Sequence, residues 1–162
     1  MKTLLVIALG LLCSVAQAQY AFYAQRSQSW TGYPGAGYVI VPFQTTRVND
    51  GSYFDVASSK WWPPAGPVLL QAQLFISDSG GIPVNPSYVA KLIKNEWIDV
   101  CTGIGAAGSL WWTVVIQLSC SDRAQPGDYY RLAVAVSSLG PWTLDGNPAH
   151  TYFSGVALTK GP

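Results

Sequence analysis

The stretch that decides the fold is TYFSGVALTKGP, residues 151–162. Domains usually end in a polar tail that frays. Here apolar and small or polar residues alternate from 152 to 158, and the alternation reaches to within four residues of the end. Because side chains of a strand point to opposite faces in turn, this pattern predicts a buried strand over residues 152–158.

Working outward from that stretch, period-two alternation recurs along the whole chain. Turn signals such as Pro34-Gly35 and Pro126-Gly127 separate the segments, and no stretch keeps a helical period. The pattern predicts an all-β antiparallel sandwich or barrel. The expected strands cover residues 21–26, 37–43, 68–76, 88–94, 97–101, 112–120, 130–136 and 152–158.

The beginning of the chain has the pattern of an export leader. Lys2 precedes an apolar run over residues 4–15, and Ala16-Gln17-Ala18 is a small-x-small cleavage pattern. The run is too short for a comfortable span of about 20 residues, so we expect no stable membrane insertion. We predict a signal peptide over residues 1–18 and one domain over residues 19–162, in a secreted or periplasmic protein. An uncleaved anchor is the alternative.

The net charge and its distribution do not point to a charged partner. Without Lys2 the chain carries eight basic and eight acidic residues, and the sequence has no basic stripe. This argues against nucleic acid as the partner. Charged residues make up 10% and aromatic residues 13% of the chain, a balance that favours an all-β domain with a large buried or interface area.

Two cysteines remain once Cys13 leaves with the leader. Cys101 and Cys120 are an even pair in an exported chain, and we predict that they form a disulfide. Two free buried thiols are the alternative.

Several short motifs occur in an informative order: Asn49 to Asp55, Lys60-Trp-Trp-Pro-Pro-Ala-Gly66, Leu92-Ile-Lys-Asn95, Gly127-Asp128 and Tyr152-Phe-Ser-Gly155. This series resembles the globular head of complement component one-q and its tumour-necrosis-factor-like superfamily. The resemblance implies an antiparallel jelly-roll β-sandwich of about ten strands, in which the first and last strands are central neighbours. It also implies a homotrimer. Glu96 replaces an expected glycine, and residues 122–126 look like an insertion before Gly127.

Aromatic residues are the natural candidates for binding. The chain has more of them than a small core needs: Trp30, Trp61, Trp62, Trp97, Trp111, Trp112, Trp142, Tyr129 and Tyr130. In the doublet Trp61-Trp62, one ring must point inward and the other outward. Trimer contacts, ligand stacking and ordinary edge packing are all open for such rings. The ligand-stacking candidates are Trp61, Trp111 and Trp142, with residues 106–110 and 140–147 as loops that tune the choice of ligand.

Catalytic chemistry finds little support. His150 is the only histidine, and Asp145 with a serine could complete a triad, but Asp145-Gly146 is typical of a turn. The segment Gly103-Ile-Gly105-Ala-Ala-Gly108 matches a dinucleotide fingerprint, yet no helix follows, and we expect a loop there. The single glutamate argues against a glycosidase carboxylate pair. We expect no enzyme activity.

Loop carboxylates leave one cofactor open. Calcium takes oxygen ligands from loops, and the candidates are Asp122, Asp128 and Asp145. Otherwise we expect no cofactor.

The sequence therefore predicts an exported, non-enzymatic recognition module that binds itself as a homotrimer and binds a surface glycan or protein multivalently. The alternative is a structural coat, spike or appendage subunit that uses the trimer surface for assembly.

Overall fold

A computed structural model describes residues 18–33, 35, 37–78, 87–96, 98–106, 113–137 and 140–158. In these ranges the chain forms thirteen β-strands and one short 3-10 helix, η1 (Asp50–Ser52). No helix within these ranges is long and apolar enough to cross a membrane. The predicted leader, residues 1–17, lies outside the described residues.

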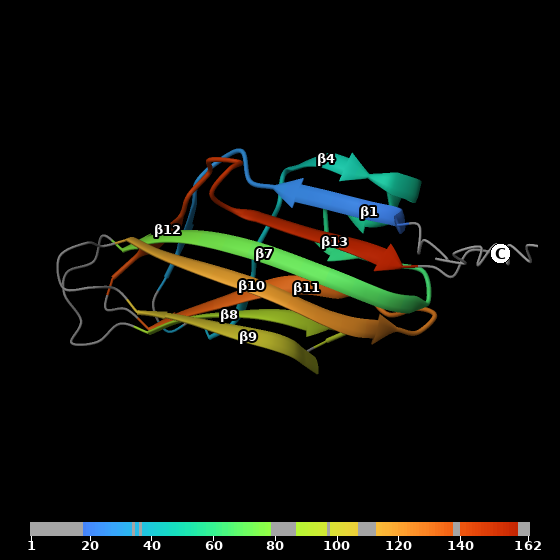
Figure 1. Ribbon diagram of the computed structural model, residues 1–162. Coiled ribbons are helices and arrows are strands. Elements are labelled where there is room, and N and C mark those ends of the chain that lie inside the picture. The colour runs from blue at the N-terminus through green and yellow to red at the C-terminus, as the bar shows by residue number, and fades with distance from the viewer. Residues whose placement is uncertain are drawn as a thin grey trace, which may run out of the picture.

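The strands form two antiparallel sheets that lie face to face (Figure 1). The first sheet runs in the order β2 (Trp30–Gly32), β12 (Trp142–Leu144), β7 (Gly66–Asp78), β13 (Tyr152–Leu158), β1 (Ala18–Gln25) and β4 (Thr45–Asn49), and β10 (Thr113–Ala124) also pairs with β7. The second runs in the order β5 (Phe54–Asp55), β6 (Lys60–Trp61), β11 (Tyr130–Ser137), β8 (Ser87–Lys94) and β9 (Ile98–Ala106), and β3 (Val39–Ile40) pairs with β11. The all-β antiparallel sandwich is confirmed.

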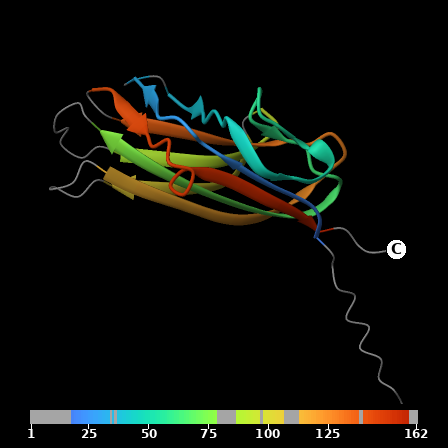
Figure 2. The same cartoon turned by 90° about the horizontal axis from the view of Figure 1, so that it is seen from above.

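The carboxyl-terminal strand lies in the middle of the first sheet, as the alternation and the resemblance predicted. β13 pairs with β1 on one side and β7 on the other, and Figure 2 shows β13 and β1 side by side from above. Phe22 of β1 is opposite Gly155 of β13, and its ring lies edge-on to Phe153 with centroids 4.7 Å apart. Both rings are buried. The two ends of the domain therefore share one core.

Gly155 is required by the rings that pack over it. A Cβ at this position would lie 2.6 Å from Phe22 Cε1, 2.8 Å from Trp61 Cζ3 and 3.1 Å from Leu70 Cδ2. These are contacts with three different buried side chains, so no single rotamer change relieves them. The glycine allows the indole of Trp61, from the second sheet, to reach the backbone of the first.

The predicted disulfide is present and closes the sandwich along one side. It joins Cys101 of β9 in the second sheet to Cys120 of β10 in the first, with 6.3 Å between the Cα atoms. Gly103 and Gly105 continue this seam, because a Cβ on either would lie within 3 Å of side chains of β10. The two described glycines of the dinucleotide-like segment therefore belong to a strand, and the loop prediction fails for residues 103–106. The remaining residues, 107 and 108, lie outside the described residues.

Other strand boundaries differ from the predictions for identifiable reasons. Only Val39–Ile40 forms a strand within the expected 37–43 segment, and Pro42 lacks the N–H that a longer ladder needs. Residues 122–124 are no insertion but the end of β10, paired with residues 66–68 of β7. Six strands, β2, β3, β4, β5, β6 and β12, have five residues or fewer, which is too short for a clear period.

Asn49 has a local role that explains its place in the motif series. Its side-chain amide donates to the carbonyl of Phe54 at 2.9 Å and its Oδ1 accepts from the Phe54 N–H at 2.8 Å. Two hydrogen bonds from one side chain thus mimic a strand partner and close the turn that contains η1.

Candidate functional site: the two outer faces

Four neighbouring strands of the first sheet carry almost no charge on their outer side, and Arg47 of β4 lies next to them. We call this outer side the amide face, and it comprises the outward side chains of β1, β13, β7 and β10. Arg123 is the only charged one among those that the structure describes on these four strands. Leu69 and Val115 are 48% and 47% exposed. Depletion of charge around exposed apolar side chains is typical of the centre of a protein interface.

The strand registers arrange the amide face in rows. One row runs Gln25, Tyr152, Gln73, Gln117 across the four strands. The next row runs Tyr23, Ser154, Gln71, Ser119. Neighbouring rows are linked by the rings of Tyr23 and Tyr152, which stack with centroids 5.1 Å apart.

Small side chains leave the middle of the amide face hollow. Gln117, which lines the hollow, is held by Gln73, because its Nε2 donates to Gln73 Oε1 at 2.8 Å. An open depression of about 240 Å³ is lined by Gln71, Ala72, Gln117, Leu118, Ser119 and Tyr152. Amide and hydroxyl groups here can accept or donate hydrogen bonds to a facing surface without the desolvation cost of a charge.

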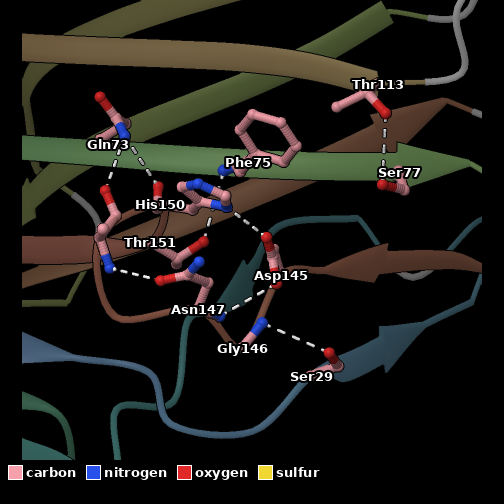
Figure 3. A network of polar contacts seen from close by, with 11 residues as sticks. Ser29, Gln73, Phe75, Ser77, Thr113, Asp145, Gly146, Asn147, His150 and Thr151 are labelled. Atoms are coloured by element: carbon pink, nitrogen blue, oxygen red, sulfur yellow. Dashed lines mark hydrogen bonds and ion pairs between the residues drawn. The ribbon is translucent and has the colours of Figure 1, made fainter.

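A polar network holds the segment before β13 against one end of this face (Figure 3). The ring of His150 stacks on Phe75 of β7 at 4.7 Å, and its Nδ1 lies 2.5 Å from Asp145 Oδ2. Gln73 Nε2 donates to the carbonyl of His150 at 3.0 Å. The contacts of His150 therefore dock a turn onto β7.

The serine that a catalytic triad would need is engaged elsewhere in this network. Ser29 accepts from the N–H of Gly146 and Ser77 lies 3.5 Å from the Thr113 hydroxyl, as Figure 3 shows. Burial alone would raise the pKa of Asp145, but hydrogen bonds from His150 and from the N–H groups of Asn147 and Gly146 hold that pKa below its usual value. The carboxylate is thus an ionised anchor of the turn.

Two of the three predicted ligand-stacking residues, Trp61 and Trp142, are buried in the core. Trp61 and Trp142 are 0% and 1% exposed, because one is inserted between the sheets and the other packs edge-on to Trp30 at 5.3 Å. A ring without accessible surface cannot stack on a ligand that arrives from solvent, so this expectation fails for both. Trp111 lies outside the described residues, as do Trp97 and Trp112. Of the two tuning loops, residues 142–144 instead form strand β12.

Trp62 is the exposed member of the doublet, as alternation required. It is 39% exposed, whereas Trp61 is buried. Its indole lies 4.7 Å from the ring of Tyr129, on the outer side of the second sheet. Lys60 and Arg131, which sequence reasoning missed, lie against the same pair of rings. The K-x-W spacing was the available signal for Lys60, since residues two apart in a strand share a face.

The calcium candidates are brought together only in part. Asp122 and Asp128 meet, but the ammonium of Lys94 lies between them, 3.2 Å from Asp122 Oδ2 and 2.8 Å from Asp128 Oδ2. Asp145 binds His150 near Phe75, at the far end of β7. Nowhere in the described ranges do three or more His, Cys, Asp or Glu residues gather as a metal site. The three aspartates therefore do not meet at one place in the described part of the chain, and calcium binding stays a prediction.

The Lys94 cluster instead ties two turns together. Asn95 Nδ2 donates to Asp128 Oδ1 at 2.9 Å, and Asn95 Oδ1 accepts from the N–H of Tyr129 at 3.2 Å. Asn95 has a φ of +56°, which asparagine tolerates in a turn. Burial would raise the pKa of Asp128, but Lys94 and hydrogen bonds from Gln125 and Asn95 lower it below its ordinary value.

Comparison with solved structures finds the same fold in animal ligand domains. Murine APRIL superposes with a TM-score of 0.61 at 13% identity, covering 86% of this chain and 98% of that one. An Eiger tumour-necrosis factor from S. frugiperda gives 0.58 at 15%, covering 88% and 94%. The globular domain of zebrafish complement 1qA gives 0.61 at 11%, covering 88% and 99%.

These likenesses establish the fold, and the resemblance drawn from the motif series is confirmed at that level. The chain has the jelly roll of tumour-necrosis-factor-like and complement one-q domains. No family model and no curated protein matches the sequence.

Proposed function

We propose that this protein is an exported, non-enzymatic recognition module that forms a homotrimer through its amide face and binds a glycan or protein surface multivalently. The observation that carries the proposal is the amide face itself, a broad surface over four neighbouring strands on which only Arg123 is charged among the described side chains. A solvated sheet face normally carries charges that keep it soluble and unpaired.

Three further observations support the assignment. Solved structures of the same fold are ligand domains of the tumour-necrosis-factor and complement one-q kind. The disulfide between Cys101 and Cys120 fits an oxidising compartment. The polar groups around the depression, such as Gln71 and Ser119, can pair across an interface, while Leu69 and Val115 supply apolar area.

The mechanism is multivalent recognition. Three identical sites on one trimer bind a polyvalent target with an avidity far above that of one site, because the second and third contacts form at a high effective concentration. A module of this kind needs no catalytic group.

Light scattering coupled to size exclusion tests the trimer. We expect a mass three times that of the chain in wild type. Gln71→Lys places a charge in the middle of the amide face and should weaken assembly by at least about 100-fold, since an unpaired charge in a dry interface is costly. Thr102→Lys, exposed on the second sheet, is the matched control and should leave the trimer intact. A wild-type monomer at all concentrations contradicts the proposal.

The same experiment separates the structural alternative. A coat, spike or appendage subunit grows into larger particles with rising concentration, whereas a recognition module stays a discrete trimer. If the particles grow with concentration, the protein is a structural subunit and the proposed recognition function is wrong.

A further inference from the structure

Two of the chain's cations lie against aromatic rings instead of carboxylates. Lys60 Nζ lies 4.2 Å from the centre of the Tyr129 ring and 5.4 Å from that of Trp62. Arg131 Cζ lies 5.2 Å from the Tyr129 centroid. We call Lys60, Trp62, Tyr129 and Arg131 the Lys60 platform. It lies on the second sheet, on the opposite side of the sandwich from the amide face.

The backbone fixes the platform in place. The Trp62 N–H donates to the carbonyl of Tyr53 at 2.8 Å, and the Tyr129 carbonyl accepts from the N–H of Asn95 at 2.8 Å. Between them, Trp61 of β6 pairs with Tyr130 of β11, so the two outward rings are carried by strands whose inward neighbours are fully buried. The platform is therefore preorganised, which reduces the entropy that a ligand must offset.

The charge of the platform is not neutralised. Elsewhere on this sheet Lys91 binds Asp99 at 2.6 Å, and Lys94 binds two aspartates. In the described part of the chain, no carboxylate lies within ion-pair distance of Lys60 or Arg131. Arg131 Nε is buried and finds no hydrogen-bond partner among these residues. Two acidic groups lie nearby: Asp55 is opposite Lys60 in the β5–β6 pair and interacts with it electrostatically without an ion pair, and Glu96 accepts from the Tyr129 hydroxyl at 3.3 Å.

An aromatic ring attracts a cation but leaves its formal charge and most of its donors free for an anion. The platform thus combines a partly exposed flat ring with an ammonium next to it. A sugar that carries a carboxylate fits both features, because its ring can lie on the indole while its carboxylate reaches the ammonium. An acidic peptide side chain has the charge but has no sugar ring to lie on the indole.

We propose that the Lys60 platform binds an acidic sugar, with the sugar ring on Trp62 and its carboxylate on Lys60. Arg131 is a positioning residue that does not contact the ligand. It packs against the ring of Tyr129 and adds positive potential to the platform. This site names a ligand class for the recognition function proposed above and rests on that function, but it needs one chain only and does not rest on the trimer.

Trisaccharides of galacturonate, glucuronate and mannuronate, each compared with its methyl ester, test the site. Binding is measured by calorimetry and by the indole N–H signal of Trp62 in a ¹⁵N correlation spectrum, assigned with Trp62→Phe. We expect at least one acid to bind and to shift that signal. Its ester, which keeps the ring but not the charge, should bind at least about tenfold more weakly.

Lys60→Gln and Trp62→Ala should each weaken binding of that acid by at least about tenfold. Lys60→Gln keeps most of the aliphatic stem, so it separates charge from packing. Tyr38→Ala and Lys91→Gln are the matched controls: this pair is also a cation on an exposed ring, 4.6 Å apart, but Asp99 already neutralises the lysine. Both controls should bind as wild type.

Three results would overturn the proposal: no uronate binds at millimolar concentration, acid and ester bind equally, or Lys60→Gln binds as wild type does. Circular dichroism of each variant confirms that a loss of binding is not a loss of fold. None of these outcomes changes the mass of the assembly measured by light scattering, so the site and the trimer fail separately.

Discussion

The two outer faces of the sandwich are built from strands of the same kind and have opposite surface chemistry. The amide face carries glutamines, serines and tyrosines, with one charge at its margin. The opposite face carries Lys60, Lys91 and Arg131, each within about 5 Å of a tyrosine ring. A neutral, hydrogen-bonding face suits another copy of the chain, whereas a charged aromatic face stays wet and suits a ligand. Under the function proposed above, assembly and recognition use opposite faces of the sandwich.

The largest expected effect comes from breaking the core that both faces share. Gly155→Val inserts a branched side chain where even a Cβ is closer than 3 Å to Phe22 and Trp61. Overpacking usually costs 1–3 kcal/mol, and with two sheets forced apart we expect a loss of about 3 kcal/mol in the free energy of unfolding. Urea denaturation measures it. Both the trimer and uronate binding should be lost together.

Ser154→Ala is the control for that variant, because Ser154 is the outward neighbour on the same strand. It should change the unfolding free energy by less than about 0.5 kcal/mol. If Gly155→Val has the same free energy of unfolding as wild type, the core between the two sheets tolerates a larger side chain at this position. The two faces would then not depend on close packing at Gly155.

A smaller effect is expected at the seam between the sheets. Replacing Cys101 and Cys120 by serine removes a cross-link that closes a loop of about 20 residues, which the chain-entropy model values at roughly 3 kcal/mol. Removal of a native disulfide typically lowers the free energy of unfolding by about 2–5 kcal/mol. Here Gly103 and Gly105 still allow β9 to pack closely on β10, so we expect a value at the low end of that range. We expect a loss of about 2 kcal/mol.

Hydrogen exchange localises that second effect. Amides of β13, in the centre of the first sheet, exchange through global unfolding and should speed up only as far as the global loss requires. Amides of β9, the edge strand that carries Cys101, should speed up more. Equal acceleration in both strands would mean that the disulfide stabilises the whole sandwich rather than its edge.

The sequence predicted the long strands well, because their alternation is set by burial on one face only. Residues 152–158 were predicted with their exact bounds, and the closeness of Phe22 and Phe153 followed from the family resemblance. The short strands at the sheet margins were missed, since two or three residues such as Val39 and Ile40 carry no period.

The binding residues were harder to predict, and Trp61 shows why. Alternation states that one of Trp61 and Trp62 is outward, but it does not state which, and Trp61 was chosen wrongly. The Lys60 platform joins residues in and next to β6 and β11, and such a meeting depends on the strand order of the second sheet. The Lys94 ammonium between Asp122 and Asp128 depends on it too, which is why carboxylate counting suggested calcium.

The smallest expected effect is a pH dependence that arises at the Lys94 cluster. Lys94 and neighbouring donors lower the pKa of Asp122 and Asp128 against the opposing effect of burial. A carboxyl whose folded-state pKa is below the unfolded value stabilises the fold fully above about pH 4 and loses that contribution as pH falls through the folded value. Asp128→Asn keeps the shape and removes the charge, so it should cost on the order of 1 kcal/mol at pH 7 and flatten the acid limb.

Urea titrations of wild type and Asp128→Asn between pH 2 and pH 7 measure this dependence. The difference between the two proteins should shrink toward zero at the acid end, where the wild-type carboxylate is itself protonated. Asp50→Asn, which removes an exposed carboxylate outside the Lys94 cluster, is the control for the loss of one negative charge. If the difference in free energy of unfolding between wild type and Asp128→Asn persists at pH 2, Asp128 stabilises the fold through its hydrogen bonds alone. Its charge would then contribute nothing to holding the two turns of the Lys94 cluster together.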